Sequence, residues 1–240
     1  MKKILFIGSP MFCLVAAQHL SQKNEIHLIE LHAEIGMPTS QPGFIHDFDL
    51  LADYLTKEQL LFLKPHDNQP GWGLRSEWVT KHLAMNAANK GVHIHTRTRI
   101  TSIENQNDQY LVNYLGAGPQ ANNHLLVDII VDGSPYVPSA PGGLQHTLPE
   151  HLNFQYPELG VTTNWFGGTA LTTDCQEVPE QAWTFDRAEG LSEVWFEGKS
   201  NWTPKHGWIE YIESLLPFTA SQRTIDAQIT EGKRLSGAIL

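Results

Sequence analysis

The sequence predicts an α/β fold with a parallel sheet, and three observations lead to this prediction. A short apolar run over residues 2–7 stops at Gly8, and small and apolar residues then recur at helical spacing over 11–22. A second apolar run, over 25–31, carries the acid Glu30 near its end. Strands that alternate with helices in this way are typical of βαβ units. Further strands are predicted over residues 92–104, which alternate strongly, 110–115 and 125–131.

The first strand–helix turn has the layout of a dinucleotide-binding unit. Gly8 permits a tight turn, the helix start offers free N–H groups to a pyrophosphate, and Glu30 can hold a ribose. The full fingerprint, G-x-G-x-x-G, has glycines where this chain has Pro10 and Cys13. Proline has no N–H to donate, and a cysteine side chain separates helix and strand slightly. We therefore expect a nucleotide site with relaxed geometry, and the alternative is a turn used only for packing.

Two segments before residue 91 have helical spacing. Residues 47–63 predict two short helices, after a loop over 36–43 that is rich in Gly, Pro, Thr and Ser. Residues 65–73 are expected to form a loop. From Arg75, apolar residues at helical spacing predict a helix that stops at Gly91, a residue type that commonly ends helices.

The second half of the chain gives fewer signals. Residues 161–166 and 191–197 are expected to be strands, because apolar and β-branched residues there are bounded by glycines. Residues 208–216 predict a helix between two proline-containing turns, and a last helix is expected within 219–240.

Composition and charge exclude several classes of protein. Among 240 residues, Lys and Arg total 16 against 26 Asp and Glu, and the basic residues do not cluster, so we expect no nucleic-acid partner. No run approaches the roughly 20 apolar residues that span a bilayer, so we expect no membrane span. The basic start precedes a run too short for a secretory signal, and two distant cysteines form no disulfide framework. A cytoplasmic protein is expected.

Two later stretches resemble a known family. Residues 73–104 contain Arg75, an A-x-x-x-G-V-x-I stretch that ends at Ile94, and T-x-I-x-x-I from Thr98. Residues 127–142 end an apolar strand in Asp-Gly-Ser-Pro, with prolines every three residues thereafter. Both stretches resemble motifs of FAD-dependent oxidoreductases of the glutathione-reductase-like superfamily, most closely the monooxygenase, halogenase and geranylgeranyl-reductase branch.

The resemblance implies a Rossmann-like FAD-binding domain over residues 1–144, a parallel sheet with a β-meander. It further implies a small mixed α+β substrate or cap region over 145–218, and a C-terminal helix over 219–240 that returns to the first domain. Arg75 would lie near the flavin diphosphate and the backbone at Ile100 would face the adenine. The expected cofactor-binding residues are Gly8, Ser9, Pro10, Met11, Phe12, Glu30, Leu31, Arg75, Ile100, Asp132, Gly133 and Asp226.

In function, the resemblance implies an FAD-dependent oxidoreductase of monooxygenase or dehydrogenase type that acts on an unidentified small organic substrate, with NAD(P)H as a candidate reductant. Two alternatives stay open, a cofactor-free protein with an eroded flavin site and one that binds NAD alone. A homo-oligomer or a partner subunit also stays open. No catalytic residue is identified. Four tryptophans could line an apolar pocket or pack in a core: Trp165, Trp183, Trp195 and Trp202.

Two other constellations are weighed and set aside. His93 and His95 share a strand face, and H-x-H can hold a metal, but Arg97 and Arg99 on that face would oppose a cation, so no metal site is expected. Asp174-Cys175 with His206 could suggest a thiol hydrolase, but the sequence identifies no group to orient them.

Overall fold

A computed structural model of the chain describes residues 1–118, 122–150, 152 and 154–239. At its centre lies a parallel sheet in the order β10-β1-β2-β6. Helix α1 (Met11–Leu20) connects the first two strands, as predicted for the βαβ unit. The strands are β1 (Lys3–Ile7), β2 (Glu25–Ile29), β6 (His93–His95) and β10 (Ile129–Asp132).

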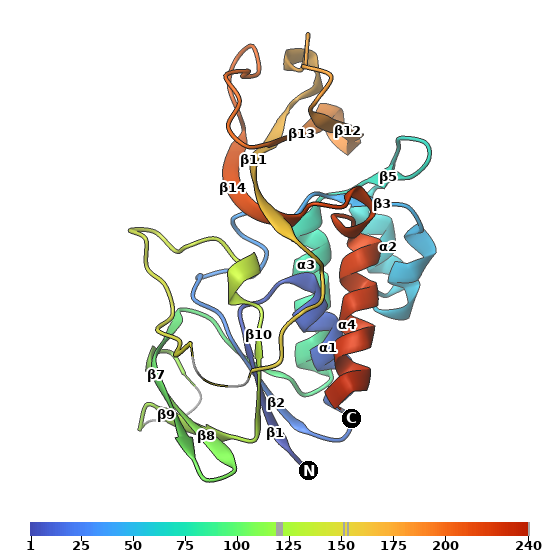
Figure 1. Cartoon of the computed structure of the whole chain (residues 1–240). Coiled ribbons are helices and arrows are strands. Elements are labelled where there is room, and N and C mark those ends of the chain that lie inside the picture. The colour runs from blue at the N-terminus through green and yellow to red at the C-terminus, as the bar shows by residue number, and fades with distance from the viewer. Residues whose placement is uncertain (119–121, 151, 153, 240) are drawn as a thin grey trace.

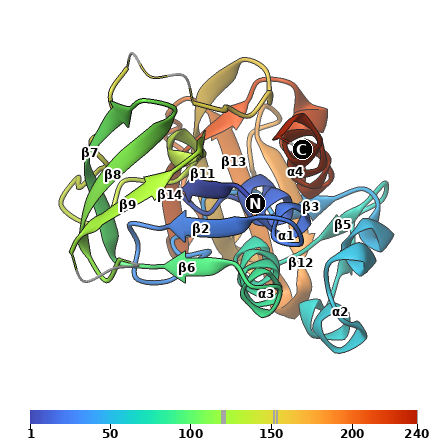
Figure 2. The ribbon, with the colours of Figure 1, turned by 90° about the horizontal axis from the view of Figure 1, so that it is seen from below.

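Helices cover one face of the parallel sheet, and a β-meander covers the other (Figure 1, Figure 2). The helices are α1, α3 (Ser76–Asn89) and α4 (Ile225–Ile239), and α4 packs along α1. The meander consists of β7 (Thr98–Gln106), β8 (Gln109–Gly116) and β9 (His124–Val127). Side chains alternate along β1, so Ile4 and Phe6 join the core beneath the helices while Leu5 and Ile7 join the core beneath the meander.

A second, antiparallel sheet lies beyond the carboxyl ends of the parallel strands (Figure 1). Its order is β12-β13-β11-β14, and one of its faces packs around Phe44. Its strands are β11 (Thr162–Leu171), β12 (Trp183–Arg187), β13 (Leu191–Glu197) and β14 (Glu210–Pro217). Smaller elements are β3 (Phe44–Ile45), β4 (His66–Asp67), β5 (Trp72–Gly73), α2 (Lys57–Leu63), and the 3-10 helices η1 (Phe48–Asp53), η2 (Ser134–Tyr136), η3 (Thr172–Asp174), η4 (Ala188–Gly190) and η5 (Ala220–Gln222).

Two segments predicted as single strands are each two strands. The segment 92–104 divides after His95, and Arg97, at φ 53°, turns the chain from the parallel sheet to the meander. The segment 125–131 divides at Asp128, whose carboxylate accepts a hydrogen bond from the Lys3 N–H at 2.6 Å. In the first segment Ile94, Thr96, Thr98 and Ile100 keep a period of two across the break, and in the second Val127 and Ile129 flank Asp128. The sequence pattern therefore does not mark either break.

The helix predicted over residues 208–216 is wrong, because Glu210–Pro217 form β14 and pair antiparallel with β11. Ile209, Ile212 and Leu216 recur at intervals that a helix would also give, and pairing with a neighbouring strand overrides that local preference. The loop predicted over 65–73 contains the short strands β4 and β5.

The predicted fold class is confirmed: a Rossmann-like α/β unit with a parallel sheet and a β-meander, joined to a smaller region of mixed structure. Within the described ranges, no helix combines the length and apolar character that crossing a membrane requires. The sequence between the predicted strands 110–115 and 125–131 is rich in Gly and Asn and is expected to be a loop, and its residues 119–121 lie outside the described residues.

Candidate functional site

The carboxyl ends of β1, β2 and β10 lie together, at the edge where open α/β sheets bind ligands. The Gly8 N–H donates to the Ile29 carbonyl at 2.9 Å, and the Gly133 N–H donates to the Ile7 carbonyl at 2.9 Å. A cavity of about 190 Å³ opens beside these ends. It is lined by Gly8, Glu30, Leu31, Ser134, Pro135, Val137, Pro138, Ser139, Leu144, Gln145 and His146. Three of the predicted cofactor-binding residues, Gly8, Glu30 and Leu31, therefore border one cavity.

Gly8 is required by both its conformation and its surroundings. Its φ of +80° lies in the left-handed region, which favours glycine. A Cβ on Gly8 would stand 3.0 Å from Val137 Cγ2 and 3.3 Å from the Gly133 carbonyl carbon. The turn after β1 is thus tightly packed against the chain that leaves β10.

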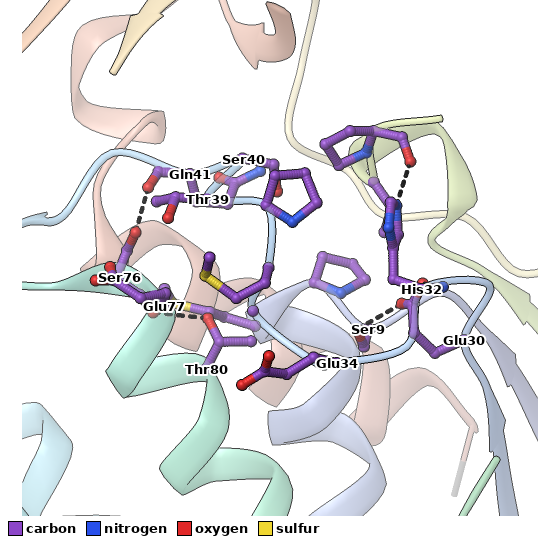
Figure 3. Close-up of a pocket in the computed structure, with 17 residues that line it drawn as sticks. Ser9, Glu30, His32, Glu34, Thr39, Ser40, Gln41, Ser76, Glu77 and Thr80 are labelled. Atoms are coloured by element: carbon purple, nitrogen blue, oxygen red, sulfur yellow. Dashed lines mark hydrogen bonds between the residues drawn. The ribbon is translucent and has the colours of Figure 1, made fainter. Parts of the chain in front are cut away.

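Glu30 is fixed at the end of β2 by donors from this chain. Its side chain is buried, Oε2 accepts from the Ser9 hydroxyl at 2.6 Å, and Oε1 accepts from the His32 N–H at 2.9 Å. Figure 3 shows the contact between Ser9 and Glu30. A ribose hydroxyl would have to share or displace these donors.

A second, smaller cavity of about 30 Å³ lies at the start of α1 (Figure 3). Ser9, Pro10 and Met11 form one wall, and residues 36–41 and the first turn of α3 form the other. Three buried polar atoms along it have no hydrogen-bond partner among the described residues: Thr39 Oγ1, Gln41 Oε1 and Glu77 Oε2. This space suits a water molecule, which can supply hydrogen bonds to such atoms.

FAD does not fit among these residues as they are arranged. The two cavities measure about 190 and 30 Å³, and a third of about 240 Å³ adjoins the larger one along residues 134–139 and Gln145. Each of the three is smaller than the roughly 300–1,000 Å³ that ligand sites typically span. Glu30, Glu34 and Glu77 also line the smaller cavity. Glu34 is paired with Lys81, and Glu77 with Arg75 and Arg187. Glu30 instead accepts from uncharged donors, the Ser9 hydroxyl and the His32 N–H, so it is the carboxylate that would repel a diphosphate. Cofactor binding would require residues 36–41 and the chain after β10 to move.

Asp132 and Gly133 lie at the end of β10, as the family resemblance predicts. Burial raises the pKa of Asp132, although its carboxylate accepts from the Ser134 N–H at 2.9 Å and hydroxyl at 2.6 Å. A Cβ on Gly133 would stand 2.6 Å from Cys13 Sγ and 3.0 Å from Pro10 Cγ. The two residues that interrupt the glycine fingerprint therefore pack against Gly133.

The Ile100 backbone is already paired within the chain. Its N–H donates to His146 Nδ1 at 3.1 Å, and its carbonyl accepts from the Thr147 N–H at 3.0 Å. Burial, together with the nearby Arg99 and His32, lowers the pKa of His146 to about 4, which keeps its ring neutral near pH 7. His146 was not among the residues predicted from sequence, since it belongs to no periodic segment.

Arg75 borders a different cavity, with Phe62, Trp78 and Glu189. Its Nε donates to Glu77 Oε1 at 2.7 Å, and its guanidinium lies over the Trp78 ring. The structure therefore does not bring Arg75 to the cavity that Gly8 and Glu30 border.

Asp226 lies at the start of α4 and joins that helix to β3. Its two carboxylate oxygens accept from the His46 and Asp47 N–H groups, each at 2.8 Å. Phe12, a predicted cofactor-binding residue in the first turn of α1, is buried, and its ring packs edge-on against Tyr136. Both arrangements hold the fold together.

The remaining candidates from sequence have structural surroundings. Trp165, Trp183 and Trp195 pack in the core of the antiparallel sheet, and Trp202 packs on Phe196. His206 and Asp174 do pair, at 2.9 Å, but Cys175 donates to the Leu171 carbonyl.

His93 and His95 share a face with His27, and the His27 and His95 nitrogens are 3.2 Å apart. Arg97 and Arg99 lie beyond the end of β6 and do not extend this face, contrary to the prediction. In the described part of the chain, no three His, Cys, Asp or Glu side chains converge as a metal site would require.

Comparison with known proteins gives structural neighbours only. Neither the protein-family models nor the curated proteins yield a match to this sequence. A geranylgeranyl bacteriochlorophyll reductase-like protein from Thermoplasma acidophilum matches with a TM-score of 0.60 and 12% identity, over 91% of this chain and 66% of that one. Halogenase PltM, solved in complex with FAD, matches with a TM-score of 0.59 and 12% identity, over 99% of this chain and 69% of that one.

The p-nitrophenol 4-monooxygenase PnpA from Pseudomonas putida DLL-E4 matches with a TM-score of 0.56 and 10% identity, over 100% of this chain and 80% of that one. The chain spans only 46% of the Diels-Alderase PyrE3, at a TM-score of 0.55 and 13% identity. At these identities the likeness concerns the fold. The chain therefore has the fold of a halogenase solved with FAD bound, a monooxygenase and a geranylgeranyl-reductase-like protein.

Proposed function

We propose that the protein is an FAD-dependent oxidoreductase that acts on a small organic substrate. One observation carries the proposal: the Gly8 turn, the Glu30 carboxylate and the chain after β10 converge on one cavity at the carboxyl edge of the parallel sheet. That edge is where open α/β sheets bind nucleotides. The fold shared with a halogenase solved with FAD supports FAD as the nucleotide.

In this proposal residues 1–144 bind the cofactor, and 145–218 form the substrate side. Residues 219–240 brace α1, against which α4 packs. Gly8 and the start of α1 would lie by the diphosphate, and Glu30 would bind the adenosine ribose. Bound flavin would supply the redox chemistry. Because FAD does not fit the present arrangement, no catalytic step is assigned to a residue.

A cofactor-free protein is the second candidate, and the buried Glu30 carboxylate beside the start of α1 favours it. Glu30, Glu34 and Glu77 line the space where a diphosphate would approach the helix. Glu34 and Glu77 are paired with basic side chains, but within the described residues Glu30 is not, and it accepts the Ser9 hydroxyl at the start of the helix. The helix N-terminus attracts an anion by about 0.3–1 kcal/mol, which the Glu30 carboxylate can offset. Under this alternative the carboxyl edge binds neither FAD nor another dinucleotide.

Titration of the purified protein with FAD separates the two candidates. After gel filtration has removed unbound FAD, the protein should retain absorption bands near 370 and 450 nm, about where oxidised flavin absorbs. We also expect a rise in melting temperature of about 5–10 °C at a hundredfold excess over the dissociation constant. Glu30→Gln should weaken FAD binding about tenfold or more, because a bond to a charged group is lost.

The matched control is Glu104→Gln, an exposed change on β7, which should bind FAD within about twofold of the parent protein. Circular dichroism shows whether each variant is folded. A colourless protein whose melting temperature does not respond to FAD would refute the proposal and support the cofactor-free alternative.

A further inference from the structure

Residues 137–147, which we call the strap, run across the carboxyl edge of the parallel sheet after η2. Val137, Pro138, Ser139, Leu144, Gln145 and His146 together form much of the lining of the 190 Å³ cavity. Val137 packs directly on the Gly8 turn, with Cγ2 3.0 Å from the position of a Gly8 Cβ. The strap therefore occupies the approach to Gly8 and Glu30.

Two histidines hold the strap from opposite sides. On the β2 side, His32 Nε2 donates to the Pro138 carbonyl at 2.8 Å. On the meander side, the Ile100 N–H donates to His146 Nδ1 at 3.1 Å, and the Thr147 N–H donates to the Ile100 carbonyl at 3.0 Å. His146 can accept this bond only while its ring is neutral at Nδ1.

Between these attachments the strap is a surface turn. Ala140 and Leu144 pair through their backbones, and Gly142 and Gly143 have positive φ, so the chain reverses direction there. Leu144 is 40% exposed, and Val137 and Pro138 are half-buried. Ala140 is buried and Val137 packs on the Gly8 turn, so these contacts, along with the hydrogen bonds of His32 and His146, hold the strap in place. Surface turns generally open at a lower free energy than core strands.

We propose that the strap is a built-in cover of the nucleotide site, closed by the His146–Ile100 hydrogen bond, and that it must lift before a nucleotide binds. This inference rests on the proposed function, since it concerns access to the same site. A closed majority state weakens the measured affinity by the fraction of molecules that are open. Removing the His146 bond should therefore tighten FAD binding.

The test compares FAD dissociation constants of the parent protein and three variants. His146→Ala removes the acceptor and should bind FAD about 3–10-fold more tightly, as expected when one hydrogen bond no longer holds the closed state. His146→Asn places an acceptor oxygen at the position of Nδ1 and should reverse most of the gain in affinity seen in His146→Ala. The control, His66→Ala, changes an exposed histidine on β4 and should have no effect.

Hydrogen exchange gives a second measurement. FAD should increase exchange across residues 137–147 while it protects the turn after Gly8. Should His146→Ala fail to fold by circular dichroism, His32→Ala releases the strap from the other side and carries the same expectation.

The outcomes separate the two proposals. If parent and His146→Ala proteins bind FAD equally, or if FAD leaves exchange of the strap unchanged, the cover is refuted and the proposed function stands. If no variant binds FAD, the proposed function is refuted, and the cover with it. Tighter binding by His146→Ala, reversal of most of that gain in His146→Asn and faster exchange of the strap would together support the inference.

Discussion

Pro10 and Cys13 stand where the dinucleotide fingerprint has glycines, and the structure shows what compensates for them. Gly133 offers only a hydrogen to these two side chains, and its φ of −100° is one that any residue adopts. The small residue required for close packing of α1 on the sheet is therefore on the facing strand end. Position 133 therefore requires glycine because of the space between the strand end and α1, and not because of its backbone conformation.

Gly133→Ala should lower the free energy of unfolding by about 1–3 kcal/mol, because the new methyl group would overlap Cys13 Sγ. The double variant Cys13→Ala/Gly133→Ala should recover part of this loss, since the overlapping sulfur is gone. Urea denaturation of the parent, both single variants and the double variant measures the coupling energy. Strictly additive effects would contradict the proposed contact.

The predicted residues that the structure brings to one cavity, such as Gly8 and Glu30, are those positioned by the chain's local geometry. Gly8 and Glu30 follow strands whose ends must meet at one edge, so their proximity follows from the βαβ topology. Arg75 and Asp226 were predicted from resemblance, and their side chains have other partners: Glu77 for Arg75, and the His46–Asp47 backbone for Asp226. Side-chain direction at a helix start is set by tertiary neighbours that a motif does not encode.

At the scale of elements, the closest helix contact is between α4 and α1. A Cβ on Gly232 would stand 2.5 Å from Val15 Cβ and 2.7 Å from the Phe12 carbonyl oxygen. The backbone of α1 cannot yield as a flexible side chain would. Gly232 thus sets the distance at which α4 closes the apolar core beneath the parallel sheet.

Gly232→Ala should destabilise the protein by about 1–3 kcal/mol, although alanine favours helix by up to about 1 kcal/mol. Gly237→Ala is the matched control on the same helix, because a Cβ there meets no atom within 4 Å. We expect Gly237→Ala to stabilise by about 0.5–1 kcal/mol. Thermal and urea unfolding measure both changes, and a neutral Gly232→Ala would argue against tight packing of the two helices.

The elements also show where sequence prediction ends. Strands and helices with strong periodicity, such as β1, α1 and α3, were predicted within a few residues of their bounds. β14 was predicted as a helix because its apolar residues fit either period, and its pairing with β11 lies some 50 residues away in sequence. The breaks within 92–104 and 125–131 depend on which sheet each half joins, which is a tertiary choice.

For the whole molecule, a buried charge network joins the antiparallel sheet to the parallel unit. Arg187 Nη1 lies 3.0 Å from Glu193 Oε1, and Arg187 Nη2 lies 3.6 Å from Glu77 Oε1 at the start of α3. Glu193 Oε2 accepts from the Gly43 N–H at 3.1 Å. Burial raises the pKa of Glu193 to about 7, against the opposing effect of Arg187. Between about pH 4.5 and pH 7, the Glu193 carboxyl binds its proton more fully in the folded state than in the unfolded state. Considered by itself, Glu193 therefore contributes less to the free energy of unfolding as the pH rises.

Buried and half-buried histidines change the pH dependence of stability in the direction opposite to Glu193. They should dominate the loss of unfolding free energy of the whole chain as the pH falls. Burial lowers the pKa of both His95 and His146 to about 4, and it also lowers the pKa of His27. Between about pH 4 and the usual histidine pKa of about 6.5, the unfolded state therefore binds more protons than the folded state. Stability should rise with pH across this window and be lost as pH falls through it.

We expect each of His95 and His146 to contribute about 1–3 kcal/mol to the loss of unfolding free energy between pH 7 and pH 4, after allowing for solvent screening. Urea denaturation at several pH values measures this slope. His146→Gln should flatten the slope because Gln does not titrate, whereas His66→Gln, at an exposed histidine, should leave it unchanged. An unchanged slope in His146→Gln would mean that this ring is protonated equally in both states, which is incompatible with its accepting the Ile100 N–H in the folded protein.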